Sequence, residues 1–172
     1  INKMSKIKLN NVRLSFPSLF QKAVFEGKEG KYEATFLLSK EDVKTKKVID
    51  DAIAKAIAEA KVKVPSGNYC IKDGDDTFAE KEYDGYEGCW SIKAANSKRP
   101  TVIDRDKTPL TAEDEKLYAG CYVNAVIDIW IQNNNYGKRV NANLYGVQFL
   151  EDGESFGAGP VDVSDDFDDL DL

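Results

Sequence analysis

Residues 121–149 read CYVNAVIDIWIQNNNYGKRVNANLYGVQF and carry the strongest β-strand signal of the chain. Residues 121–132 and 139–149 alternate apolar and polar side chains, which is the two-residue period of a strand with one buried face. The stretch between them is rich in Asn and Gly, which tolerate the backbone of tight turns. These residues predict two long antiparallel strands joined by a hairpin.

A two-residue loop at Asn134 and Asn135 sets the predicted register of this hairpin. Apolar side chains then face one another on the inner side: Ile129 with Val140, Ile127 with Ala142, and Ala125 with Leu144. Polar and aromatic side chains face one another on the outer side: Trp130 with Arg139, Asp128 with Asn141, and Asn124 with Tyr145. A slip of one residue would mix the two sets, so the pattern favours this register.

Shorter alternating segments predict further strands at residues 6–16, 31–38, 69–72, 89–95 and 101–104. In the first of them the apolar phase flips at Asn10 and Asn11, which indicates a bulge or sharp bend. One long helix interrupts the strands. Ser39 and Asp42 form a capping-box-like start, and an apolar stripe at helical spacing continues to about Val62. A single helical turn is expected to begin at Thr111.

This succession of elements predicts a mainly β protein, an OB-type small β-barrel with one inserted long α-helix. Residues 1–150 are expected to form the barrel domain, and residues 151–172 a disordered acidic C-terminal tail. The tail contains nine carboxylates and no Lys or Arg, whereas residues 1–150 contain 24 Lys and Arg against 21 Asp and Glu. The formal net charge of −6 is therefore the sum of a basic body and an acidic arm.

The composition also excludes several classes of function. The chain has no His, so Ser-His-Asp and Cys-His catalysis and His-bound zinc are excluded. Its three cysteines are far apart and form no CxxC pair, which argues against a zinc site or a disulfide framework. We therefore expect no enzyme activity, no metal and no cofactor. No apolar run approaches a membrane span and no signal sequence opens the chain, so the expected location is the cytoplasm of a bacterial host.

Aromatic and basic residues occur together on the predicted outer surfaces of the strands. A protein that holds single strands without reading sequence needs aromatic planes for the bases and cations for the phosphates. The candidates for stacking are Tyr122, Trp130 and Tyr145. The candidates for phosphate contacts are Arg13, Lys93, Lys98, Arg99, Lys138 and Arg139.

Two other functions remain open at the level of sequence. The acidic loop expected from Asp73 to Glu87 could bind Mg²⁺ or Ca²⁺ and serve a nuclease, although Phe78 stands where an EF-hand needs Gly. Alternatively, the acid-rich surface could make the chain a protein-interaction module that mimics DNA. Such a module would bind basic proteins and ignore DNA even without its tail.

Two stretches resemble a family of tailed-phage proteins that was first curated as a domain of unknown function. They are WSIKAANSKRPTVID at residues 90–104 and LYAGCYVNAVIDIWIQNNNYGKRVNANLYGVQFLEDGESFG at residues 117–157. The resemblance implies an OB-fold single-stranded DNA-binding protein of phage replication and recombination. It covers most of the chain.

The acidic tail suggests both regulation and recruitment. Its last residues combine carboxylates with apolar side chains: Asp165, Asp166, Phe167, Asp168, Asp169, Leu170, Asp171 and Leu172. We expect this arm to compete with DNA for the basic groove and, once displaced, to dock replication or recombination proteins. Deleting residues 153–172 should then tighten DNA binding. The aromatic, amide-rich edge of the hairpin would also allow a homodimer.

Overall fold

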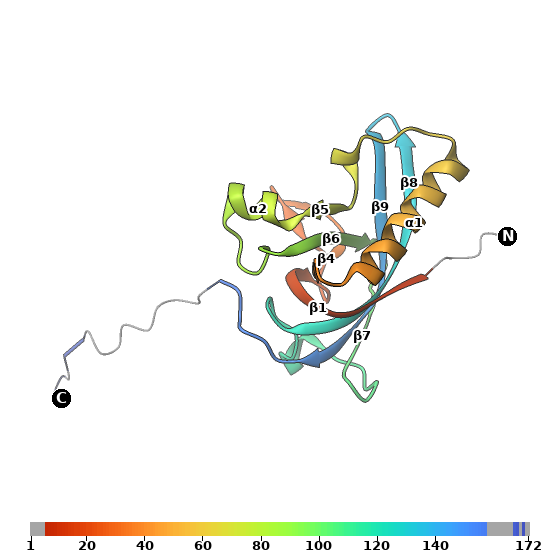
Figure 1. The fold of residues 1–172 in the computed structure, drawn as a ribbon. Coiled ribbons are helices and arrows are strands. Elements are labelled where there is room, and N and C mark those ends of the chain that lie inside the picture. The colour runs from red at the N-terminus through yellow and green to blue at the C-terminus, as the bar shows by residue number, and fades with distance from the viewer. Residues whose placement is uncertain (1–5, 158–166, 169, 171–172) are drawn as a thin grey trace.

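The computed structural model describes residues 6–157, 167–168 and 170. Nine β-strands, two α-helices and two short 3-10 turns follow one another along these described residues, and Figure 1 shows their arrangement. In order they are β1 (Lys6–Ser18), β2 (Val24–Phe25), β3 (Lys28–Glu29), β4 (Tyr32–Ser39), α1 (Val43–Ala60), η1 (Ser66–Asn68), β5 (Ile71–Asp73), α2 (Gly74–Lys81), β6 (Cys89–Asn96), β7 (Thr101–Ile103), η2 (Ala112–Asp114), β8 (Tyr122–Asn134) and β9 (Gly137–Glu151).

Five of the strands close into a barrel. β1 pairs with β4, β4 with β6, and β8 with both β1 and β9, all antiparallel. The ring closes where β6 meets β9 in parallel at Ala95 and Asn143. This order, with one parallel contact between the third and fifth barrel strands, confirms the predicted OB-type barrel. The inserted helix α1 connects the second and third barrel strands, β4 and β6, and packs against β8 and β1.

The core is formed by the inward-facing side chains of the barrel strands. Leu9, Phe36, Ile92, Ile127 and Leu144 are fully buried. They belong to five different strands, so the apolar face of each barrel strand is buried against the apolar faces of the others. The outward-facing positions of the same strands are therefore left for a binding surface.

β1 bends at the predicted point. Ile7 and Leu9 are buried before the bend and Val12 and Leu14 after it, and the pairing with β8 shifts between Leu9 and Val12. Asn11 adopts a φ of +55°, and its N–H donates to Oδ1 of Asn124 at 2.9 Å. The bulge thus lets one strand present apolar residues of both phases to the core.

The predicted start of α1 was wrong by about one turn. Asp42, rather than Ser39, is the N-cap residue, and its carboxylate accepts hydrogen bonds from N and Oγ1 of Thr45 at 3.1 and 2.8 Å. Ser39 instead ends β4 and accepts a hydrogen bond from N of Glu41. Ser and Asp are both favourable N-cap residues. Ser39 pairs with Cys89 in the sheet and so remains part of the strand, which leaves Asp42 to cap the helix.

The register of the β8–β9 hairpin was also predicted incorrectly, by two residues near the turn and by three beyond the bulge, where Ala125 faces Val147 and Asn124 faces Gln148. Asn134 pairs with Gly137, so the loop is Asn135–Tyr136, and Trp130 faces Asn141 instead of Arg139. Gly137 supplies the positive φ of this turn (+123°), and Oδ1 of Asn134 accepts from N of Tyr136 at 2.9 Å. A shift of two residues preserves the faces of both strands, so the inner and outer sets near the turn are as predicted.

The acidic segment after β5 differs from the predicted loop, because residues 74–81 form α2. Asp73 caps this helix by accepting from N of Asp75 at 2.9 Å. Asp75 and Asp76 lie in its first turn and Lys81 in its last, where each charge complements the helix dipole. The N-cap residue and the charges at both ends of α2 are all visible in the sequence.

The predicted turn at Thr111 is confirmed as η2, with a complete capping box between Thr111 and Asp114.

Candidate nucleic-acid interface

A long groove of about 1210 Å³ crosses the outer face of the barrel. Its floor is formed by outward-facing residues of β4 and β6, among them Thr35, Lys93 and Ala95. β9 and Trp130 of β8 form one side. The segment from Asn68 to Lys72 and helix α2 contribute to the walls, and Phe25 of the β2–β3 hairpin projects from the long β1–β4 connection.

Five cations line this groove against two carboxylates. The cations are Lys31, Lys72, Lys81, Lys93 and Arg139, and the carboxylates are Glu33 and Glu80. Nζ of Lys93 lies 2.9 Å from Oε2 of Glu33, and Nζ of Lys72 donates to the carbonyl of Gly67 at 3.0 Å. All five cations are solvent-exposed, so their positive potential is available to a polyanion.

Six aromatic side chains line the same groove: Phe16, Phe25, Tyr69, Tyr83, Tyr86 and Trp130. Two of them are unusually open to solvent, with Phe16 56% and Phe25 77% exposed. The ring of Tyr83 meets that of Phe16 edge-on, with ring centroids 4.9 Å apart. Exposed rings beside cations are the arrangement that stacks bases while phosphates are held by charge.

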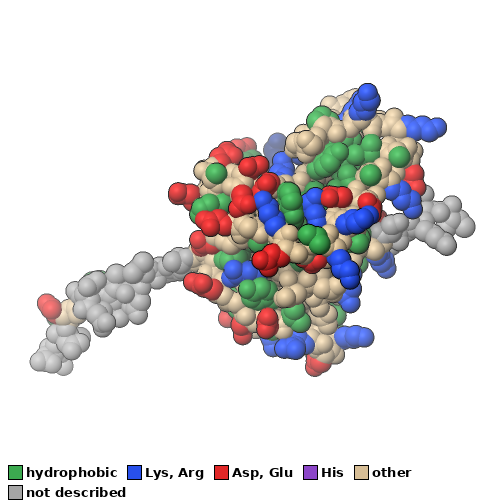
Figure 2. All heavy atoms as spheres, in the orientation of Figure 1, with side chains coloured by type: hydrophobic (Ala, Val, Ile, Leu, Met, Phe, Trp, Pro, Cys, Tyr) green, Lys and Arg blue, Asp and Glu red, His purple; other side chains and the backbone are tan. Residues whose placement is uncertain are grey.

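The charges on the face shown in Figure 2 are segregated. Acidic side chains are crowded on the side that carries α2, whereas Lys and Arg predominate on the side of α1. A nucleic-acid backbone is repelled by the acidic side of this face.

Three of the predicted contact residues, Lys93, Trp130 and Arg139, line the groove together. Three others are exposed and lie outside its lining: Lys98, Arg99 and Lys138. Lys138 is held next to the groove, because its carbonyl accepts from Nδ2 of Asn68 at 2.9 Å. The Arg99 guanidinium lies 5.4 Å from the ring centroid of Phe20.

The remaining three predicted residues lie elsewhere. Arg13 packs between the rings of Tyr122 and Phe156, at 5.3 and 4.2 Å from the ring centroids. Tyr145 lines a separate hollow of about 360 Å³ beside Lys6 and Lys8. The pairing of β8 with β9 shifts opposite Tyr145, between Val126 and Ile127, and this bulge separates Tyr145 from Trp130.

Several groove residues were missed by the sequence reasoning, chiefly Phe16, Phe25, Tyr83 and Lys72. The alternation of residues 6–16 predicts an ordinary strand position for Phe16, but this residue has a φ of +46° where the β1–β4 pairing shifts between Ser15 and Ser18. Phe25 stands in a two-stranded hairpin of only two residues a side. Neither a local backbone outlier nor so short a strand leaves a periodic signal.

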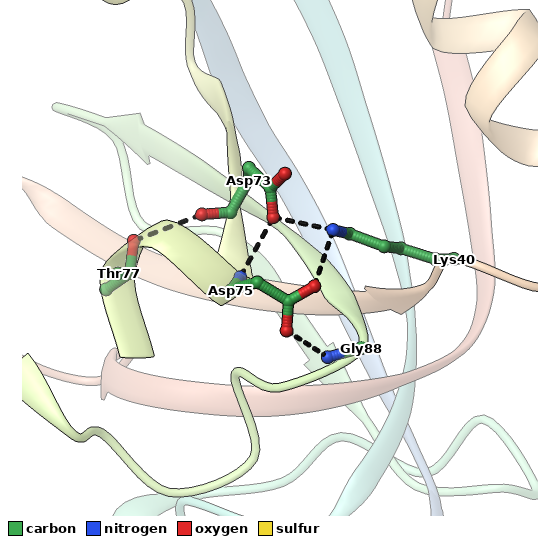
Figure 3. Close-up of polar contacts among 5 residues, drawn as sticks. All are labelled: Lys40, Asp73, Asp75, Thr77 and Gly88. Atoms are coloured by element: carbon green, nitrogen blue, oxygen red, sulfur yellow. Dashed lines mark hydrogen bonds and ion pairs between the residues drawn. The ribbon is translucent and has the colours of Figure 1, made fainter. Parts of the chain in front are cut away.

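Two of the carboxylates considered for a metal site, Asp73 and Asp75, have structural roles (Figure 3). Nζ of Lys40 lies 2.6 Å from Oδ1 of Asp73 and 2.7 Å from Oδ2 of Asp75, and Oδ1 of Asp75 accepts from N of Gly88 at 2.8 Å. The Lys40 ammonium lowers the pKa of both carboxyl groups, and they raise the pKa of Lys40. Within the described part of the chain no three Asp, Glu, Cys or His are grouped to hold a metal.

Cys70 lines the groove, and its thiol is unreactive near neutral pH. Burial raises the pKa of the Cys70 thiol to about 11, so it stays protonated near neutral pH. A protonated thiol is a poor nucleophile and a poor metal ligand. Cys70 therefore contributes packing to the groove wall.

Most of the predicted tail residues lie outside the described residues, namely Asp165, Asp166, Asp169, Asp171 and Leu172. Of those described, Asp168 is exposed, and Phe167 and Leu170 are 73% and 79% exposed. No helix in the described ranges is long and apolar enough to cross a membrane.

Comparisons with known proteins give the family of this chain. The sequence model described as Enterobacter phage Enc34, ssDNA-binding protein, matches residues 5–172. Protein p50 of Acyrthosiphon pisum secondary endosymbiont phage 1 is 44% identical over 179 aligned positions, which cover 97% of this chain and 95% of the relative.

Solved structures agree with this match. The single-stranded DNA-binding protein from bacteriophage Enc34 in complex with ssDNA has a TM-score of 0.82 at 40% identity, covering 88% of this chain and 89% of that one. Its C-terminal truncation gives 0.80 at 39% identity, covering 88% of each chain. The single-stranded DNA-binding protein gp2.5 of bacteriophage T7 gives 0.58 at 14% identity over 99% and 98% of the two chains, a likeness of fold alone.

The family model and the Enc34 structure are described as single-stranded DNA-binding proteins, which confirms the prediction of a non-catalytic phage protein. The family expected from residues 90–104 and 117–157 is likewise confirmed. The chain belongs to the family of the single-stranded DNA-binding protein of Enterobacter phage Enc34.

Proposed function

We propose that this chain binds single-stranded DNA in the groove over β4 and β6, with little preference for sequence. The observation that carries the proposal is the joint lining of one groove by five cations and six aromatic rings. OB-folds bind oligonucleotides on the face of their second and third strands and on the first and last hairpin connections. Here these are β4, β6, the β1–β4 connection with Phe25, and the β8–β9 hairpin with Arg139.

The cations would hold phosphates and the rings would stack on bases. Stacking tolerates any base because each has a π-face, which accounts for binding without sequence readout. Each phosphate neutralised on a single strand contributes about −0.7 to the slope of log affinity against log salt. Five such contacts give a slope of about −3.5. Lys98, Arg99 and Lys138 would extend the contact beyond the groove, and the fold would cover roughly 4–16 nucleotides.

We assign no direct DNA contact to Arg13 and Tyr122. Arg13 donates from Nη2 to the carbonyl of Glu154 at 2.7 Å and from Nε to that of Gly120 at 3.1 Å. Two aromatic rings also lie against its guanidinium, so much of this side chain is engaged within the protein. Tyr145, with Lys6 and Lys8, would meet DNA only if the strand left the groove.

Fluorescence anisotropy of a labelled oligo(dT), measured across a salt series, tests the groove. Trp130→Ala should lower affinity by roughly 5- to 150-fold, the loss of one stacked base. Arg139→Gln should make the salt slope shallower by about 0.7. Lys55→Gln, on the exposed face of α1, is the matched control and should change neither quantity. Wild-type affinity in both groove variants would contradict the site, and an absence of binding by the wild type would favour the protein-interaction module.

The acidic tail would act as an internal competitor and as a docking arm. Residues 151–157 of this predicted tail are described, and Gly157 donates from its N–H to Oδ2 of Asp84, next to Tyr83 of the groove. The fifteen residues beyond Gly157 can span up to about 50 Å, which is ample to reach the groove, and six of them are Asp. DNA would displace this arm and release it to replication or recombination proteins in the host cytoplasm. A homodimer through the hairpin edge would be detected by sedimentation.

A further inference from the structure

The barrel is followed by a short segment that turns back across its surface, residues 152–157, here called the strap (Figure 1). Its first part is held by Tyr118, whose hydroxyl donates to Oδ1 of Asp152 at 2.8 Å and accepts from N of Gly153 at 3.0 Å. Its middle is held by the hydrogen bond from Arg13 to Glu154. Gly120 lies so close to Glu154 that a Cβ there would overlap the Glu154 carbonyl. The strap is therefore held against the barrel by hydrogen bonds and close packing.

The far end of the strap is fastened to the loop between α2 and β6, residues 82–88. Gly157 donates from its N–H to Oδ2 of Asp84 at 2.9 Å, and the Phe156 N–H donates to the carbonyl of Ala119 at 2.9 Å. The Phe156 ring lies between the Arg13 guanidinium and the backbone of Gly85. A Cβ on Gly85, which has a φ of +83°, would overlap that ring.

The same loop carries the aromatic wall of the groove. Tyr83 packs edge-on against Phe16, and its ring centroid lies 5.6 Å from that of Tyr86. Tyr86 is 4% exposed, and its hydroxyl lies 3.0 Å from Oγ of Ser15 in a hydrogen bond. Phe156 contacts Gly85, two residues along this loop from Tyr83, and is not part of the groove lining.

We propose that Phe156 is a positioning residue for the DNA groove. Its ring, clamped by Arg13, supports Gly85 from behind and so holds Tyr83 against Phe16, where the pair forms a stacking surface. The inference rests on the proposed function and deepens it, because it adds a residue outside the groove on which DNA affinity depends. The strap, which leads into the acidic residues of the tail, would then also support the wall of the groove.

A double-mutant cycle between Phe156 and Tyr83 in the full-length chain tests this role, with oligo(dT) anisotropy as the readout. Phe156→Ala should lower affinity about fivefold, a fraction of the loss expected for a stacked base. The salt slope should stay at the wild-type value, because no cation is removed. In a Tyr83→Ala background Phe156→Ala should have almost no further effect, and Phe156→Tyr, which keeps the ring, should restore binding. Additive losses, or a Phe156→Ala variant that binds like the wild type, would overturn the proposal.

A charge-matched pair at Asp84 keeps the proposal testable if Phe156→Ala folds poorly. Asp84→Asn and Asp84→Ala both remove the same exposed negative charge, but only the alanine removes the acceptor of the Gly157 N–H. The alanine variant should therefore bind oligo(dT) several-fold more weakly than the asparagine variant. Equal affinities would contradict the inference. If Trp130→Ala and Arg139→Gln had no effect either, the proposed groove itself would fail, so the two failures are distinguishable.

Discussion

Phe16 occupies a backbone conformation that a bulky residue seldom adopts. Its φ of +46° falls in the left-handed region, which costs a residue with a Cβ about 1–2 kcal/mol. The ring it presents is 56% exposed at the rim of the groove. An exposed aromatic held in a strained conformation is easier to understand as a functional feature than as a contribution to stability.

Replacing Phe16 separates these two roles. Phe16→Gly and Phe16→Ala both remove the ring, so both should lose the same oligo(dT) affinity, by roughly 5- to 150-fold if the ring stacks on a base. Glycine adopts a positive φ without steric cost, so Phe16→Gly should be more stable than Phe16→Ala by about 1 kcal/mol. Urea unfolding measures the second difference. A glycine variant less stable than the alanine variant would contradict the strain assigned to this position.

Among the elements, α1 shows how strand pairing selects between two good caps. Asp42→Ala should destabilise the chain by about 1 kcal/mol, because N of Thr45 loses its acceptor. Ser39→Ala is the matched control and should cost less than about 0.5 kcal/mol, because its hydroxyl accepts only one exposed bond. Thermal or urea unfolding of the two variants is sufficient. A larger loss for the serine variant would support the capping box expected from sequence.

The anchor of α2 predicts a dependence of stability on pH. Asp73 and Asp75 have pKa values in the folded chain below their unfolded value of about 3.9, chiefly through their hydrogen bonds with Lys40. Their contribution is therefore complete above about pH 4 and is lost as the pH falls through the folded pKa values. Lys40→Met should be less stable than the wild type at pH 7, and this gap should shrink at pH 3.

The check is urea unfolding at both pH values, with Lys55→Met as a control for the loss of a lysine on the exposed face of α1. A stability gap between wild type and Lys40→Met that is the same at pH 3 and pH 7 would show that the network contributes no carboxylate charge to folding.

The elements of the barrel could be predicted because their signals are local and periodic. The flip at Asn10 and Asn11 marked a bulge, and the alternation in residues 121–132 and 139–149 marked the two longest strands. The turn of that hairpin was misplaced because several candidate turn residues, Asn133, Asn134, Asn135 and Gly137, lie within one short stretch. Only the conformation of Gly137 and the Asn134 side chain decides which two form the loop.

At the scale of the whole molecule, the site could be predicted only in part. Lys93, Trp130 and Arg139 were found because they stand on the outer faces of recognisable strands. Phe16, Phe25 and Tyr83 come from a bulge, a minimal hairpin and a loop, and the barrel brings them together over distances that no sequence spacing encodes. Arg13, a basic strand residue predicted to contact phosphate, is half-buried and donates hydrogen bonds to the carbonyls of Gly120 and Glu154.

The tail makes a prediction about the intact molecule. A chain ending at Gly157 keeps the strap and loses six Asp, so it should bind oligo(dT) more tightly than the full chain, most clearly at low salt. A chain ending at Glu151 also loses the strap, which should offset part of this gain. Anisotropy at two salt concentrations compares the three chains. Equal affinity of the full chain and the chain ending at Gly157 would remove the competitor role of the tail.

An NMR titration of the ¹⁵N-labelled chain with oligo(dT) measures directly where DNA lies on the protein. Binding in the groove predicts that the largest amide shifts occur in residues 68–72, 91–95 and 139–143, with smaller changes at Lys6, Lys8 and residues 145–148. Shifts concentrated in the second set would place the strand in the hollow beside Tyr145 and contradict the central claim. An unchanged spectrum would contradict DNA binding itself.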